Sequence, residues 1–155
     1  MTDHSFYENV VESELATGGV YASVTKGTSM RPLFKTNRDM IILKRPTGEL
    51  KKYDVALYRI RSGKYVLHRV VGVRDDVYLI RGDNTYVLER VPKNDVIGVL
   101  TAFNRKGKKY TTESASYRMY SRVWNFVYPI RYLVFKLFGL AYRVYKRLFK
   151  RKNKR

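Results

Sequence analysis

The chain has 155 residues, of which 45% are hydrophobic and none is cysteine. This length suits one domain with an appendage, and the hydrophobic share excludes a chain that is disordered throughout. The absence of cysteine excludes a disulfide framework and a thiolate metal site. The two histidines lie far apart in sequence and provide no zinc-binding spacing, so we expect no metal and no cofactor.

The formal net charge of +19 is concentrated toward the C-terminus. Residues 1–100 contain 16 Lys and Arg against 12 Asp and Glu, a net charge of +4. Residues 101–155 contain the other 16 basic residues and a single acid, Glu113, a net charge of +15. We therefore divide the chain into a helical lead-in over residues 1–19, a β domain over residues 20–113 and a basic helical tail over residues 114–155.

The first 19 residues predict a short helix that precedes the β domain. Gly18 and Gly19 would end this helix, and the segment lacks the basic start and the apolar run of a secretory signal peptide. We therefore expect no export signal. The apolar residues that recur at helical spacing among acids are Phe6, Val10, Val11 and Leu15.

Short segments rich in β-branched and aromatic residues follow, separated by turns that contain Gly, Pro, Asn and Asp. Closely spaced strands of this kind are typical of an antiparallel sheet that closes in part into a barrel. The predicted fold is mainly β, a partly closed antiparallel β-barrel with a short N-terminal helix and a C-terminal basic amphipathic helix. We expect strands over residues 20–25, 39–43, 54–59, 64–73, 77–81, 96–100 and 110–112.

Ser29 follows the first of these strands in the stretch Lys-Gly-Thr-Ser-Met-Arg-Pro over residues 26–32. Gly27 permits a tight turn and Pro32 cannot continue a strand ladder, so we expect Ser29 at a corner with its hydroxyl directed out of the sheet. Most serines in turns are solvated. A nucleophilic serine needs a base within hydrogen-bond reach and usually a third group that holds the base.

The candidate base is His68, because the other histidine, His4, lies in the polar N-terminal segment. His68 falls inside an apolar strand, where a histidine is more often structural than catalytic. The next strand ends in Gly82-Asp83-Asn84, a sequence that is typical of a turn. The serine, histidine and Gly-Asp-Asn motifs in this order are a more specific sign of a catalytic serine than any one motif alone.

Four motifs in this order resemble the catalytic domain of type I signal peptidases and the related LexA-like serine peptidases. They are Gly-x-Ser-Met-x-Pro from Gly27, Tyr-Asp-Val-Ala-Leu-Tyr from Tyr53, His-Arg-Val-Val from His68 and Arg-Gly-Asp-Asn from Arg81. The resemblance covers roughly residues 20–103. The base in this family is a lysine, or a histidine in the archaeal and endoplasmic-reticulum branch, so this chain resembles the histidine branch.

The resemblance implies a serine endopeptidase in which Ser29 is the nucleophile, His68 the general base and Asp83 the acid that orients the base. Many members have a serine two residues before the nucleophile, where this chain has Gly27. The implied oxyanion hole therefore consists of backbone N–H groups around Gly27, Ser29 and Met30. The implied substrate is a leader or signal peptide that lies extended against an edge strand, with small side chains before the cleaved bond.

Two features of the family have no counterpart in this sequence. Many members begin with a transmembrane anchor, and LexA-like repressors carry an N-terminal DNA-binding domain. We expect neither here, because the roughly 20 residues before the first strand include no apolar run and leave no room for a recognition module.

The tail predicts an amphipathic helix that starts or kinks at Pro129. Charged residues interrupt its apolar runs, so it lacks the about 20 apolar residues that a membrane span requires. One face carries Leu133, Val134, Leu137, Leu140, Ala141, Val144 and Leu148. The other face carries Arg131, Lys136, Arg143, Lys146, Arg147 and Lys150, with Phe135, Tyr142 and Phe149 at the border.

This pattern suits a helix that lies in the plane of an anionic membrane surface, which would make the protein a peripheral one on the cytoplasmic side. Packing of the apolar face on the barrel, with the basic face solvated, explains the pattern equally well. Two alternatives to a peptidase also remain. A nucleic-acid-binding protein would use the basic tail on phosphates, although no recognition motif is visible and nucleic acid is the less favoured partner. A non-catalytic member of the fold would bind peptides or partner proteins.

Overall fold

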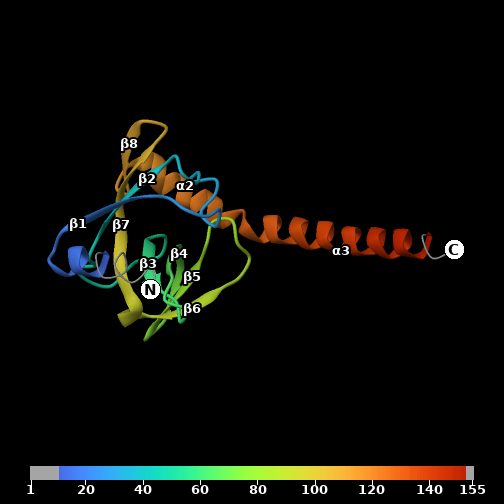
Figure 1. Cartoon of the computed structure of the whole chain (residues 1–155), viewed down its shortest axis with the longest axis horizontal. Coiled ribbons are helices and arrows are strands. Elements are labelled where there is room, and N and C mark those ends of the chain that lie inside the picture. The colour runs from blue at the N-terminus through green and yellow to red at the C-terminus, as the bar shows by residue number, and fades with distance from the viewer. Residues whose placement is uncertain (1–10, 153–155) are drawn as a thin grey trace, which may run out of the picture. The chain divides into compact units, whose positions relative to one another are not determined.

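The computed structural model describes residues 11–152 and the side chains up to residue 146 (Figure 1). His4, Phe6 and Val10 therefore lie outside the described residues. The chain divides into two compact units, the first ending at Arg122 and the second beginning at Val123. Residues 11–16 are helical and include Val11 and Leu15, whose side chains are buried in the first unit.

The described part of the first unit contains one antiparallel sheet of eight strands. The order of pairing is β1-β2-β7-β3-β4-β5-β6, and β8 pairs with the C-terminal part of β7. No pairing among the described strands joins β1 to β6, so the sheet is not closed. The strands are β1 (Val20–Val24), β2 (Met40–Lys44), β3 (Val55–Arg59), β4 (Tyr65–Val73), β5 (Val77–Arg81), β6 (Glu89–Pro92), β7 (Val96–Arg105) and β8 (Lys108–Thr111).

These strands confirm the expectation of a mainly β, antiparallel fold. The strand expected over residues 96–100 continues to Arg105 as β7, whose length lets it pair with β2, β3 and β8. β6 has no counterpart among the expected strands, because its four residues include only one buried apolar side chain, Val91. A short 3-10 turn (Lys93–Asp95) links β6 to β7.

The central strand β3 distributes its side chains between two cores. Val55 and Leu57 pack in the cluster on one face, together with apolar residues of β2 and β7. Ala56 and Tyr58 pack in the cluster on the other face, with apolar residues of β4, β5 and β6. Successive side chains of a strand point to opposite faces, so this near-continuous apolar run is what a strand covered on both sides requires.

A buried ion pair crosses from β4 to the loop after β5. The guanidinium of Arg69 donates from Nε and Nη2 to the two carboxylate oxygens of Asp83, each at 2.8 Å, and both side chains are almost fully buried. Nη1 of Arg69 also donates to the backbone carbonyl of Tyr53 at 2.9 Å. A two-point contact of this kind fixes the orientation of both groups.

Helix α2 (Ala115–Phe126) supplies the remaining partners of the ion pair. Nη1 of Arg69 donates to the Tyr117 hydroxyl at 3.1 Å and to Ser121 Oγ at 2.9 Å, and the Tyr120 hydroxyl donates to Asp83 at 3.0 Å. The first unit therefore includes α2 as far as Arg122, whereas the sequence assigns all residues after 113 to the tail.

The second unit contains the end of α2 and helix α3 (Tyr128–Lys152). Pro129 occupies the first turn of α3, where a missing N–H costs nothing. No described helix is long and apolar enough to cross a membrane. The apolar side chains along α3 are exposed, with Leu133, Leu137 and Leu140 between 56% and 57% accessible.

We expect Asp83→Asn to lower the free energy of unfolding by about 3 kcal/mol or more, because it leaves the buried Arg69 guanidinium without a counter-charge. Urea unfolding followed by circular dichroism measures the loss. Asp75→Asn, at an exposed position in the turn before β5, is the matched control and should change stability by less than about 0.5 kcal/mol. A loss below about 1 kcal/mol for Asp83→Asn would contradict this account of the ion pair.

Candidate active site

Ser29 lies in the loop between β1 and β2, and three features shape this loop. Gly27 has a φ of +78°, a conformation that glycine adopts without strain. Thr25 is buried, and its Oγ1 donates to the backbone carbonyls of Lys35 and Asp39 at 3.0 and 3.1 Å. The buried Asp39 carboxylate accepts a hydrogen bond from the backbone N–H of Lys35 at 2.7 Å. The start of the loop at Thr25 and its end at Asp39 are therefore both held to Lys35.

His68 lies on β4 and is bound through one of its two ring nitrogens. Nδ1 is 2.9 Å from Glu89 Oε1 and 3.2 Å from the Tyr58 hydroxyl, and this hydroxyl donates to Glu89 Oε2 at 2.8 Å. A carboxylate can only accept hydrogen bonds, so the proton between His68 and Glu89 belongs to Nδ1. The neutral imidazole therefore presents Nε2 as an acceptor.

The loop after β5 brings Nε2 of His68 and the backbone of Ser29 together at Gly82. A Cβ placed on Gly82 would lie 3.0 Å from His68 Nε2 and 2.8 Å from the Ser29 carbonyl oxygen. The backbone N–H of Asn84 donates to the Ser29 carbonyl at 2.7 Å, and the Asn84 side-chain amide donates to the Thr28 carbonyl at 3.3 Å. Only glycine at position 82 permits this close approach.

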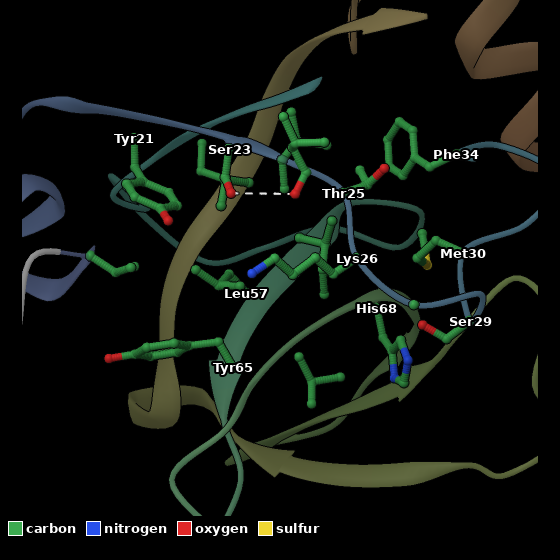
Figure 2. A pocket seen from close by; sticks show the side chains of 17 residues that line it. Tyr21, Ser23, Thr25, Lys26, Ser29, Met30, Phe34, Leu57, Tyr65 and His68 are labelled. Atoms are coloured by element: carbon green, nitrogen blue, oxygen red, sulfur yellow. Dashed lines mark hydrogen bonds between the residues drawn. The ribbon is translucent and has the colours of Figure 1, made fainter. Parts of the chain in front are cut away.

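Figure 2 shows the Ser29 side chain beside the imidazole of His68, at the edge of a pocket. Ser29 is partly buried and His68 is buried. Because Glu89 holds Nδ1, the ring edge that carries Nε2 is the edge available to the serine. An activated serine needs a base beside its hydroxyl and an acid that orients the base, so Ser29, His68 and Glu89 are the candidates for these three roles.

Burial lowers the pKa of His68 below its ordinary value of 6.5, although the Glu89 carboxylate acts in the opposite direction. The imidazole is therefore neutral at pH 7 and can accept a proton. Burial, and secondarily the hydrogen bond to Glu89, raises the pKa of Tyr58, so this phenol keeps its proton. Tyr58 thus acts as a fixed donor that orients Glu89.

The resemblance assigns Asp83 to orient His68, but the Asp83 carboxylate accepts hydrogen bonds from other residues. These are Arg69 and Tyr120. The carboxylate hydrogen-bonded to His68 belongs to Glu89, which we did not select from the sequence. The physical reason is the alternation of β4, which directs His68 and its neighbour Arg69 to opposite faces of the sheet.

The backbone around Ser29 offers donors for an oxyanion. Among the described residues, the N–H groups of Gly27, Ser29 and Met30 donate no hydrogen bond, whereas the N–H of Arg31 is bonded to the Thr28 carbonyl. These three groups are the ones that the sequence selects for an oxyanion hole. In the part of the chain that the structure describes, no group of three or more His, Asp or Glu side chains could hold a metal ion.

The pocket beside the two residues has a volume of about 440 Å³. Its walls come from β1 and from the first half of β4, and its buried floor includes Ile41, Leu43 and Leu57. Among the described strands, β1 pairs only with β2, and the pairing of β4 with β5 begins at Arg69. Within this part of the chain, one edge of each wall is therefore unpaired. An unpaired edge can accept an extended peptide as a further strand.

No protein-family model matches the chain, and the search of curated proteins found no match. The resemblance to signal peptidases therefore depends on the four motifs and on the candidate site around Glu89, to which each motif contributes one residue, namely Ser29, Tyr58, His68 and Gly82.

If His68 is the general base, the rate of the reaction should rise with pH through a midpoint below 6.5, because burial lowers the pKa of the imidazole. Glu89→Gln removes the charge that favours the imidazolium, so the midpoint should move to lower pH while the plateau rate falls by roughly a hundredfold or more. A pH profile of peptide cleavage by the two proteins measures both changes. Glu49→Gln, an exposed acid outside the site, is the control. A midpoint that moves upward in Glu89→Gln would contradict the assignment.

Proposed function

We propose that this chain is a serine endopeptidase of the signal-peptidase type, which cleaves a leader or signal peptide through an acyl-enzyme. The observation that carries the proposal is the approach of Ser29 and His68 Nε2 at Gly82, while Glu89 holds the opposite nitrogen of the imidazole. The partly closed barrel of the signal-peptidase family is part of the same proposal.

In the first half of the reaction, Ser29 Oγ attacks the carbonyl carbon of the scissile peptide bond as His68 Nε2 takes the hydroxyl proton. Glu89 stabilises the imidazolium that forms. The carbonyl oxygen becomes an oxyanion, which the backbone N–H groups of Ser29 and its neighbours can bind. Collapse of this intermediate breaks the C–N bond, and His68 returns the proton to the leaving amine.

In the second half, a water molecule takes the place of the amine. His68 accepts a proton from this water as its oxygen attacks the acyl carbon of the ester on Ser29. A second tetrahedral intermediate then releases the new carboxyl group, and the proton on His68 returns to Ser29 Oγ. The enzyme ends in its starting state.

The unpaired edges of β1 and of β4 before Arg69 support an extended substrate in the pocket. Backbone hydrogen bonds to a strand edge give affinity for any extended segment, and side-chain pockets give selectivity. This mode of binding suits a flexible leader or signal peptide better than a folded protein.

Ser29→Ala should reduce cleavage of peptides by roughly a thousandfold or more, because it removes the nucleophile without disturbing the fold. An internally quenched peptide library measures cleavage, and mass spectrometry of wild type trapped with a peptide boronate locates the adduct. Ser62→Ala, at an exposed turn, is the matched control and should keep full activity. Cleavage that persists in pure Ser29→Ala would overturn the assignment.

A second pair of variants tests the geometry and not the nucleophile itself. Gly82→Ala places a methyl group against both His68 Nε2 and the Ser29 carbonyl, and should reduce cleavage strongly while the protein stays folded. Gly48→Ala adds the same group where no atom lies within 4 Å and should have no effect. Peptide binding without cleavage in wild type would favour the non-catalytic member of the fold.

We also propose that α3 lies in the plane of an anionic membrane surface and brings the peptidase to membrane-proximal substrates. The aliphatic residues of α3 share one face and are exposed, and residues 123–155 contain no acid. Lys136, Arg143 and Lys146 lie on another face, where they can reach lipid phosphates. Nucleic acid would use the basic face alone and would leave the aliphatic face without a role. Arg147 and Lys150 belong to the expected basic face, but their side chains lie outside those described.

Binding to vesicles tests the role of α3. The protein should co-sediment with vesicles that contain anionic phosphatidylglycerol and much less with neutral phosphatidylcholine, and binding should weaken with salt. Leu133→Gln with Leu137→Gln should weaken binding by about tenfold or more, because it removes apolar area at unchanged charge. Val87→Gln with Leu88→Gln, two exposed apolar residues of the first unit, is the control. Salt-sensitive binding to nucleic acid but not to vesicles would overturn this part of the proposal.

A further inference from the structure

The pocket beside Ser29 contains one permanent cation and no acid. Among the described residues that line it, Lys26 is the only side chain with a fixed charge, since His68 is held neutral. Lys26 makes no ion pair within the described part of the chain. The pocket is therefore electropositive, and nothing in its lining compensates the charge of the ammonium group.

Lys26 lies in the chain between strand β1 and Ser29, where an extended substrate is proposed to bind. It follows β1, the strand at the edge of the sheet, by two residues and precedes Ser29 by three. Figure 2 shows its side chain extending into the pocket. Three extended residues span at most about 10 Å, so a group held by Lys26 belongs to a substrate residue within about three or four positions of the cleaved bond.

The surroundings of Lys26 strengthen its effect on a bound carboxylate. The floor of the pocket is apolar, with Phe34, Leu43 and Leu57 buried to 3%, 0% and 6% exposure. Lys26 is exposed in the free protein, and a peptide bound over this floor would displace water between its carboxylate and the ammonium group and so strengthen their attraction. The same floor favours an apolar side chain next to the charged one.

We propose that this pocket selects peptides with an Asp or Glu close to the cleaved bond, paired with Lys26, beside an apolar residue on the pocket floor. The inference rests on the proposed peptidase function and names its class of substrate. It adds to the small side chains that the resemblance implies, because a pocket of about 440 Å³ has room for more than a methyl group.

Internally quenched peptides that differ only by Glu, Gln or Lys at one position test the selectivity. Wild type should cleave the Glu series about tenfold faster than the Lys series at the responsive position. Lys26→Met should remove this preference, and Lys26→Glu should reverse it. Lys44→Glu makes the same charge change on the neighbouring strand β2, outside the pocket, and should keep the wild-type preference. An unchanged preference in Lys26→Glu would overturn the inference and leave the peptidase proposal intact.

A binding measurement separates selectivity from catalysis. Full-length Ser29→Ala retains the pocket, so fluorescence anisotropy should show tighter binding of the Glu peptide than of the Lys peptide, again about tenfold. This result would support the inference even if wild type cleaved no peptide. The absence of cleavage would overturn the peptidase proposal and leave the inference about peptide binding standing. Equal binding of the two peptides by Ser29→Ala would overturn the inference.

Discussion

The buried ion pair between Arg69 and Asp83 is the contact on which the candidate site depends. Asp83 lies between Gly82, where an added Cβ would meet His68 Nε2 and the Ser29 carbonyl, and Asn84, whose N–H donates to the same carbonyl. By holding Asp83 at two points, Arg69 fixes the loop that lies against Ser29 and His68, the proposed nucleophile and base. A single-point contact would leave the carboxylate free to rotate, and the loop with it. Burial of this pair is costly by itself, and the Tyr53 carbonyl and two hydroxyls of α2 offset part of the cost by accepting hydrogen bonds from Nη1 of the guanidinium.

Strand β4 carries both the Arg69 of the ion pair and the His68 of the candidate site. His68 and Arg69 are adjacent in sequence, and the pleat of the strand sends their side chains to opposite faces. One face contains the Tyr58–Glu89 pair that orients the imidazole, and the other contains the ion pair that orients the loop. The two carboxylates therefore act on different sides of one strand. The Glu89 carboxylate holds His68, the proposed base, and Asp83 holds the loop that lies beside it.

Because the sheet is not closed, it leaves strand edges on which the proposed substrate could pair. Unpaired strand edges invite unwanted pairing with other chains, and proteins usually cover or shorten them. Here two such edges, in β1 and in the first half of β4, line one pocket beside Ser29. We propose that the apolar floor and the ammonium group of Lys26 add selectivity to backbone pairing with a peptide. The exposed aliphatic face of α3 gives the second unit a separate role, which we propose is attachment to an anionic membrane surface.

Motif order selected Ser29 and His68, whose catalytic roles stay predictions. Local patterns in the sequence were sufficient to predict the antiparallel β class, most strand positions, the turn at Gly27 and the amphipathic tail. Each of these depends on residues that are close together in the chain, where alternation, turn chemistry and motif order can be recognised. Tyr58 could also have been found, because the hairpin register makes it a diagonal neighbour of His68 on the same face. The role of Glu89, the pairing of Asp83 with Arg69 and the inclusion of α2 in the first unit required the tertiary structure. These contacts join residues separated by 14 to 52 positions, and their geometry depends on sheet order and loop path, which composition and periodicity do not determine.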